Sequence, residues 1–236
     1  FEIPKKELLM LLNQPVQKIT RRAKYLLFET SDDIIISHLG MTGSWRVEKK
    51  DWQRCKHDHL AFQFKQDQFL VYEDARRFGF IEVCKKSDYL KRFQHVGIEP
   101  LDAAFDEKLI TASFKKLAAP IKNALMNQKL VVGIGNIYAS EILFKAGVSP
   151  LKKCSKITQN DYQKIWKYSR EILEEAIQHG GSTIENYKNS FGEAGGFQNR
   201  HLVYGHAGEK CSVCASLIKS KVVAGRNTFW CTTCQS

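Results

Sequence analysis

Short runs of alternating apolar and polar positions dominate the first hundred residues, and this pattern is typical of β-strands. Phe62 and Phe64 are separated by a polar residue, and apolar positions resume after a polar turn at 66–67. A period of two on either side of a turn predicts a β-hairpin. A short apolar run begins at Ile34 and ends at Gly40, which predicts a further strand.

From about residue 105 the apolar spacing changes to that of helices. One predicted helix begins at Thr158, with Asp161 three residues later as a capping signal, and ends at Gly180-Gly181. We expect one face of this helix to be apolar, formed by Ile165, Tyr168, Ile172, Leu173, Ala176 and Ile177. A second helix is predicted over 137–146.

Breaks in these patterns suggest where the domains meet. Gly97-Ile98-Glu99-Pro100 interrupts the periodicity, and residues 187–200 are polar and glycine-rich, which suggests a mobile loop. The sequence predicts an α+β chain divided into residues 1–97, a linker over 98–104, a helical domain over 105–200 and a C-terminal segment over 201–236.

Composition and charge narrow the class of protein. A hydrophobic content of 43% with 26% charged residues is typical of a globular chain, and the sequence has no membrane-length apolar run and no signal-peptide pattern. Thirty-six Lys and Arg against 25 Asp and Glu give a net charge of +11. This charge favours nucleic acid as the partner, although a merely basic protein would share it. The start at Phe1 resembles the inside of a longer protein.

Four of the seven cysteines are spaced as two metal knuckles near the C-terminus. Cys211 and Cys214 form one CxxC pair and Cys231 and Cys234 another, with sixteen residues between the pairs. Two such pairs predict one structural Zn²⁺ with four thiolate ligands, the alternative being chance or redox pairs. Between them, Ala224-Gly225-Arg226-Asn227 predicts a hairpin tip that presents a cation to a groove or phosphate, or merely to solvent.

Six further motifs occur in a characteristic order ahead of the cysteines. They are Arg21-Arg22-Ala23-Lys24-Tyr25-Leu26-Leu27, His38-Leu39-Gly40-Met41-Thr42-Gly43, Lys56-His57-Asp58-His59, Asp74-Ala75-Arg76-Arg77-Phe78-Gly79, Gly97-Ile98-Glu99-Pro100-Leu101, and the segment from Lys129 to Glu141 that contains Gly133-Ile134-Gly135-Asn136. With these motifs the whole chain resembles formamidopyrimidine-DNA glycosylase. The resemblance implies an N-terminal β-sandwich domain, a helix-two-turn-helix domain and a C-terminal zinc β-hairpin finger.

The resemblance also implies a function and its partners. We expect a monomeric base-excision-repair glycosylase and abasic-site lyase of the bacterial cytoplasm. It would act on double-stranded DNA containing oxidised purines or abasic sites, need one structural Zn²⁺ and no redox cofactor, and have no membrane partner. Two alternatives remain open at this point: an endonuclease VIII-type glycosylase for oxidised pyrimidines, and a non-catalytic damaged-DNA-binding protein.

An enzyme that flips a base out of the duplex must fill the gap it leaves. The resemblance assigns this role to Met41, Arg77 and Phe78, with Arg77 hydrogen-bonded to the base opposite the lesion. Core packing is the alternative for Met41 and Phe78. The segment 187–200 corresponds to a loop that covers the extruded base.

The remaining expected site residues match DNA-contacting positions of the family, although each could be an ordinary solvated charge. Lys24 and Arg76 would contact phosphates, and His57 the backbone near the lesion; Lys122 would lie near the damaged base or its sugar. Asn136 and Arg226 would grip the backbone around the lesion. Lys24 and Glu141 would support catalysis, although Glu141 also suits a helix surface.

One departure from the family concerns the chemistry. Family members begin with Pro-Glu, whose proline nitrogen is the nucleophile and whose glutamate is the general acid, and these 236 residues contain no such pair. We therefore expect the polypeptide as written to bind DNA, but neither to release 8-oxoguanine nor to cut abasic strands by β,δ-elimination at the rate of a family member.

Overall fold

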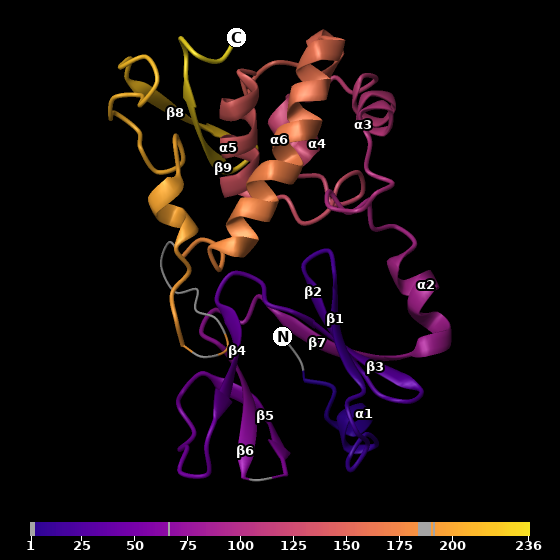
Figure 1. Cartoon of the computed structure of the whole chain (residues 1–236). Helices are drawn as coiled ribbons and strands as arrows, with labels where there is room; N and C mark the ends of the chain where they lie inside the picture. Colours follow the sequence, from indigo (N-terminus) through magenta and orange to yellow (C-terminus); the bar gives the residue numbers. More distant parts are fainter. Residues whose placement is uncertain (1–2, 66, 184–189, 191) are drawn as a thin grey trace. The chain divides into compact units, whose positions relative to one another are not determined.

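The computed structural model describes residues 3–65, 67–183, 190 and 192–236, so 187–189 and 191 of the expected covering loop lie outside the described residues. Two compact units make up the chain (Figure 1). Unit 1 is Phe1–Gln94 with Ser182–Gly196, and unit 2 is His95–Gly181 with Phe197–Ser236. The segment 182–196 thus groups with the N-terminal residues, and unit 2 begins before the expected linker.

Unit 1 is built from two antiparallel sheets. One has the strand order β1-β2-β3-β7 and the other β4-β6-β5. The strands are β1 (Lys18–Arg22), β2 (Tyr25–Glu29), β3 (Asp33–His38), β4 (Gly43–Glu48), β5 (Asp58–Phe64), β6 (Gln68–Asp74) and β7 (Phe80–Lys85), with the short helices α1 (Lys5–Leu9), η1 (Lys86–Asp88) and α2 (Tyr89–Phe93).

The core of unit 1 lies between these sheets. The Trp45 ring of β4 meets the Phe28 ring of β2 edge-on at a centroid distance of 5.3 Å, and its Nε1 donates to Ser37 Oγ at 3.0 Å. The predicted hairpin is β5–β6, and the predicted apolar run is β3, which is buried from Asp33 to Ser37. The expected β-sandwich is therefore confirmed.

Unit 2 holds four helices among its described residues: α3 (Glu107–Phe114), α4 (Ile121–Leu125), α5 (Asn136–Ala146) and α6 (Gln159–Gln178), with the short turns η2 (Cys154–Lys156) and η3 (Phe197–Arg200). The capping box predicted for α6 is present, because Thr158 accepts from the Asp161 N–H and the Asp161 side chain accepts in return from the Thr158 N–H. Helix α6 ends before Gly180 and Gly181, both at positive φ, as predicted.

The buried face of α6 differs from the prediction in one detail. The buried positions are Tyr162, Ile165, Ser169, Ile172 and Ala176, whose spacing of three and four residues keeps them on one stripe. Ile177 is 67% exposed, so its assignment to the apolar face is wrong. It follows Ala176 by one residue and is therefore turned about 100° away from the stripe.

The C-terminal residues form a β-hairpin that packs on α5. Strands β8 (Ile218–Val223) and β9 (Arg226–Cys231) pair as an antiparallel hairpin. Phe144 of α5 shares a small core with Val203, Ile218 and Phe229. In the described part of the chain, no helix combines the length and apolar character needed to span a membrane.

Candidate nucleic-acid interface and zinc site

The four C-terminal cysteines converge on one point. Their sulfur atoms all lie within 4.8 Å of one another, with Cys211 Sγ 3.9 Å from Cys234 Sγ and Cys214 Sγ 3.4 Å from Cys231 Sγ. Four sulfurs about 2.3 Å from a tetrahedral Zn²⁺ would be roughly 3.8 Å apart. The donor set and spacing fit one structural zinc ion, as predicted.

The zinc hairpin ends in a tight turn that exposes its arginine. Val223 pairs with Arg226, so Ala224 and Gly225 alone form the turn, with φ of +47° and +72°. Two successive positive φ values are the signature of a hairpin turn that matches the strand twist. Arg226 begins β9 beside this turn and is exposed.

Two other predicted DNA-contacting residues reach the same hairpin. The Lys122 ammonium of α4 donates to the Asn227 carbonyl at 3.2 Å and to Thr228 Oγ1 at 2.9 Å. Asn136, the first residue of α5, donates from Nδ2 to the same Asn227 carbonyl at 3.0 Å. Unit 2 thus gathers Lys122, Asn136 and Arg226 around one turn of chain.

Lys122 occupies an unusual place for a DNA contact, because only 1% of it is exposed. Burial, followed by the neighbouring charge of Arg226, lowers the pKa of Lys122 to about 8. An amine with this pKa donates to the hairpin and is partly neutral near pH 8. Its visible role is to hold the hairpin that carries Arg226.

The glycine turn before α5 is held by hydrogen bonds to the Gln128 side chain. The Gly133 N–H already donates to Gln128 Oε1 at 3.0 Å, and the Gln128 amide donates to the Ile134 carbonyl. Gly135 is the N-cap residue of α5, and a glycine has no side chain that could accept a hydrogen bond from the first N–H groups of the helix. A phosphate at this end of α5 would meet the N–H groups of the first helical residues, Asn136 and Ile137.

In unit 1 the three expected void-filling residues lie on two adjoining loops. Met41 is 69% exposed and Phe78 is 57% exposed, so neither is a core residue. Gly40 sits at φ +62°, and a Cβ there would lie 2.5 Å from the Phe78 carbonyl carbon and from Gly79 N. The backbones of the loops 39–42 and 75–79 are therefore in direct contact.

The two arginines of the second loop differ in their surroundings. The Arg76 guanidinium lies 4.8 Å from the centroid of the Phe78 ring, in a cation–π arrangement. Arg77 adopts a left-handed backbone with φ +55°, which is uncommon for a residue with a side chain. Both side chains are exposed.

Lys24 lies in the turn between β1 and β2 and lines a cavity of about 420 Å³ in unit 1. The cavity is also lined by Arg21, Tyr25, His38, Gly40 and Ser190. Burial, and secondarily the charge of Lys24, lowers the pKa of His38. The cavity therefore joins a predicted phosphate contact, the loop of Met41 and one residue of the expected covering loop.

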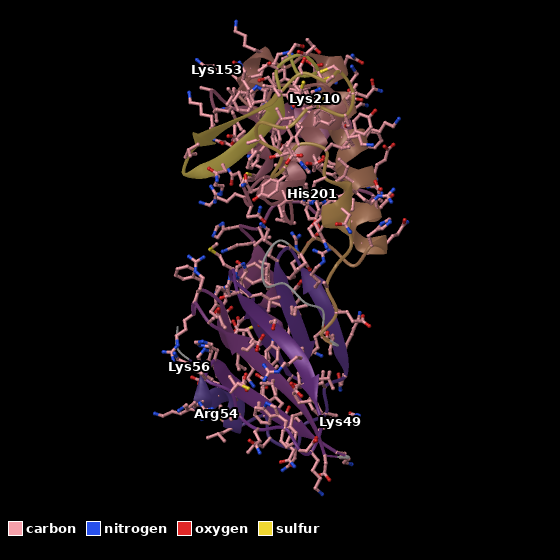
Figure 2. The ribbon with its side chains drawn as sticks, turned by 90° about the vertical axis from the view of Figure 1, so that its left-hand side faces the viewer. Lys49, Arg54, Lys56, Lys153, His201 and Lys210 are labelled. Atoms are coloured by element: carbon pink, nitrogen blue, oxygen red, sulfur yellow. The ribbon has the colours of Figure 1, made fainter. Side chains whose placement is uncertain are left out.

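His57 is exposed on the segment that leads into β5. Its carbonyl accepts from the Asp74 N–H at 3.1 Å, which attaches this segment to the end of β6. Arg54 and Lys56 precede it, and both are labelled on the same side of unit 1 in Figure 2. The segment thus contributes basic residues beside the void-filling loops.

Glu141 does not lie on a helix surface, so that alternative is wrong. It is 2% exposed, and its carboxylate accepts three backbone N–H groups, from Leu202 at 2.8 Å, Val203 at 3.1 Å and Tyr204 at 2.8 Å. Burial raises the pKa of Glu141 despite these bonds. The carboxylate anchors to α5 the chain that enters the zinc finger.

The sequence analysis assigned no role to Asp74 and Thr42, although their side chains are hydrogen-bonded to each other at the borders of the two loops. Each residue occurs there only as a member of a longer motif. Both are polar residues at the borders of exposed loops, and a fully buried carboxylate there can be recognised only from the fold.

Comparison with known proteins agrees with this geometry. The model described as formamidopyrimidine-DNA glycosylase N-terminal domain matches residues 3–81, and the H2TH domain model of the same glycosylase matches 96–188. A zinc finger model, described as found in FPG and IleRS, matches 208–236. Together the three models account for most of the chain.

Whole-chain relatives give the same picture. A formamidopyrimidine-DNA glycosylase of Bdellovibrio bacteriovorus is 42% identical over 233 residues, which is 99% of this chain and 86% of that protein. Two crystal structures of Lactococcus lactis Fpg, one with abasic-site DNA and one with Fapy-dG DNA, each superpose with a TM-score of 0.92 at 39% identity. Each covers 98% of this chain and 86% of the Lactococcus chain.

Proposed function

This chain belongs to the formamidopyrimidine-DNA glycosylase family, and we propose that it recognises oxidised purines in duplex DNA and supports cleavage of the abasic strand. As a family member it is a base-excision-repair glycosylase that binds DNA and one structural Zn²⁺.

The observation that carries the proposal is the pair of exposed apolar side chains on adjoining loops. Met41 and Phe78 are more than half exposed although their loops touch through backbone. Exposed apolar groups on a braced loop suit insertion between base steps, where unstacking costs a few kcal/mol. We assign Met41 to the void left by the flipped nucleotide and Phe78 to the step beside the opposite base.

Unit 2 would grip the backbone near the lesion. Arg226 at the hairpin tip and the N-terminus of α5 at Asn136 offer a cation and N–H donors of the kind that bind phosphate. The Asn227 carbonyl ties both elements together. This arrangement positions the DNA without reading its sequence.

The lyase chemistry of the family needs an amine at the sugar C1′ and a partner carboxylate. We propose that these 236 residues alone bind DNA in a salt-sensitive manner, with a weak preference for abasic sites, and need a Pro-Glu start to release the base and cut the strand. Neither Lys24 nor Lys122 is a good substitute, because a misplacement of about 1 Å can reduce the rate on the order of a hundredfold. Lys122 is also buried against Thr228.

Borohydride trapping on abasic-site DNA tests this proposal, because the reductant makes an enzyme–DNA imine permanent. The 236-residue polypeptide is compared with one extended by the Pro-Glu segment of the family. We expect strong trapping by the extended protein alone. Strong trapping by the 236 residues would point to an internal amine, and Lys24→Arg and Lys122→Arg would identify it.

We further propose that the protein acts as a monomer in the bacterial cytoplasm, associated with the nucleoid through DNA. The four thiolates support a reducing compartment, since zinc ligands must stay unoxidised. Light scattering on the zinc-loaded protein tests the monomer, and a mass of two chains would contradict it.

A further inference from the structure

Asp74, the last residue of β6, lies where the three predicted DNA-contacting segments of unit 1 meet. Its side chain is fully buried, with 0% exposure. Thr42 Oγ1, next to Met41, donates to Asp74 Oδ1 at 2.6 Å. The Gly79 N–H, next to Phe78, donates to Oδ2 at 2.8 Å. One carboxylate therefore holds both loops of the expected wedge.

Further contacts extend this attachment. The Arg76 N–H donates to Thr42 Oγ1 at 3.1 Å, so the hydroxyl passes the link from one loop to the other. The Tyr72 hydroxyl donates to Oδ2 at 3.3 Å. The backbone of Asp74 holds the His57 segment as well, through the His57 carbonyl and the His59 ring.

A carboxylate is the group that suits this place. Ionised Asp accepts hydrogen bonds at both oxygens and donates none, whereas Asn would turn an amide N–H toward existing donors at Thr42 or at Gly79 and Tyr72. Burial on its own would raise the pKa of Asp74, but hydrogen bonds from Thr42 and from the N–H groups of Gly79, Arg77 and Arg76 hold it below its ordinary value. The residue stays ionised at neutral pH.

We infer that Asp74 is a positioning residue that sets the geometry of the void-filling wedge by fastening the Met41 loop to the Phe78 loop. It acts through these loops and touches no DNA. The left-handed backbones at Gly40 and Arg77 are conformations that such a fastening must maintain. The inference rests on the proposed function of Met41, Arg77 and Phe78.

The test has one arm without DNA and one with it. Backbone amide exchange of Arg76 and Gly79 is measured in the zinc-loaded 236-residue protein and in Asp74→Asn, Thr42→Val and Thr42→Ser. In the second arm, 2-aminopurine is placed opposite an abasic-site analogue, where insertion of the wedge unstacks it and raises its fluorescence. Asp33→Asn serves as the control, since Asp33 is a buried carboxylate of unit 1 that pairs with Lys85.

We expect faster exchange and loss of the fluorescence rise in Asp74→Asn and Thr42→Val, with an unchanged Kd for undamaged duplex. Thr42→Ser keeps the hydroxyl and should behave as the unaltered protein, as should Asp33→Asn. Unaltered exchange and fluorescence in Thr42→Val would overturn the inference. That variant leaves the carboxylate in place, so it also decides the question if Asp74→Asn fails to fold.

The two arms separate the inference from the proposed function. If the unaltered protein binds abasic DNA without a fluorescence rise, the wedge assignment fails, and amide exchange still shows whether Asp74 fastens the loops. If the rise is present in all variants, the wedge stands and the role of Asp74 is refuted.

Discussion

Individual side chains on the 75–79 loop decide how the enzyme would recognise the base opposite the lesion. The resemblance assigns that contact to Arg77, whereas the structure stacks Arg76 on Phe78. A base-edge contact discriminates between bases by about 1–3 kcal/mol, whereas the loss of a phosphate contact weakens binding equally for all four opposite bases. The roles of the two arginines can therefore be distinguished experimentally. Substituting the residue that contacts the base changes the discrimination between opposite bases, whereas substituting the residue that contacts a phosphate lowers the affinity for all of them.

We expect Arg77→Ala to reduce the preference for cytosine opposite an abasic-site analogue by roughly 5- to 150-fold. Arg76→Ala should weaken binding uniformly. Kd values for the four opposite bases, measured with both variants at one salt concentration, check this. The reverse result, with specificity lost in Arg76→Ala, would exchange the two roles.

Gly40 is the second residue whose substitution has a defined outcome. At φ +62° any side chain costs about 1–2 kcal/mol, and a Cβ here would also overlap the backbone of Phe78 and Gly79. Gly192 has φ +83° with nothing within 4 Å of its Cβ position. Urea unfolding should show a larger loss of stability for Gly40→Ala than for Gly192→Ala, and equal losses would refute the close loop contact.

At the scale of elements, Lys122 links α4 to the zinc hairpin. Its pKa is lowered to about 8 in the folded protein, mainly by burial, against an ordinary value of 10.5. Between these values the unfolded chain binds the proton and the folded chain does not, so stability rises with pH by roughly 3 kcal/mol across the window. Below pH 8 both states are protonated and this contribution does not change.

The comparison of unaltered protein with Lys122→Met tests this coupling. The free energy of unfolding of the unaltered protein minus that of Lys122→Met should increase from pH 8 to 10.5, because the contributions of the groups that both proteins share cancel in this difference. Parallel pH profiles for the two proteins would mean that Lys122 is solvated and its docking against Asn227 and Thr228 is wrong.

Elements were more predictable from sequence than the contacts between them. The β5–β6 hairpin, the capping box at Thr158 and the CxxC pairs are local patterns, so periodicity and spacing identified them. The burial of Glu141 and Lys122 depends on segments 61 to 106 residues away, which no local pattern contains. The prediction that Ile177 lies on the apolar face failed for a local reason, because one step along a helix turns a side chain about 100° to another face.

At the scale of the whole molecule, a net charge of +11 raises the question of whether DNA binds to a defined surface or to diffuse charge. Each phosphate contact that is removed reduces the slope of log K against log salt by about 0.9. The expected phosphate contacts with full charges are Lys24, Arg76 and Arg226. Exposed cations outside the expected interface are also available, among them Lys49, Lys153 and Lys210, which are labelled in Figure 2.

We expect the triple alanine variant at Lys24, Arg76 and Arg226 to reduce the salt slope by about 3, because three contacts are lost. The triple alanine variant at Lys49, Lys153 and Lys210 changes the net charge by the same amount and should leave the slope nearly unaltered. Titrations of abasic-site duplex at several salt concentrations measure both. Equal reductions in the two variants would mean that overall charge, and not a defined interface in each unit, accounts for the affinity.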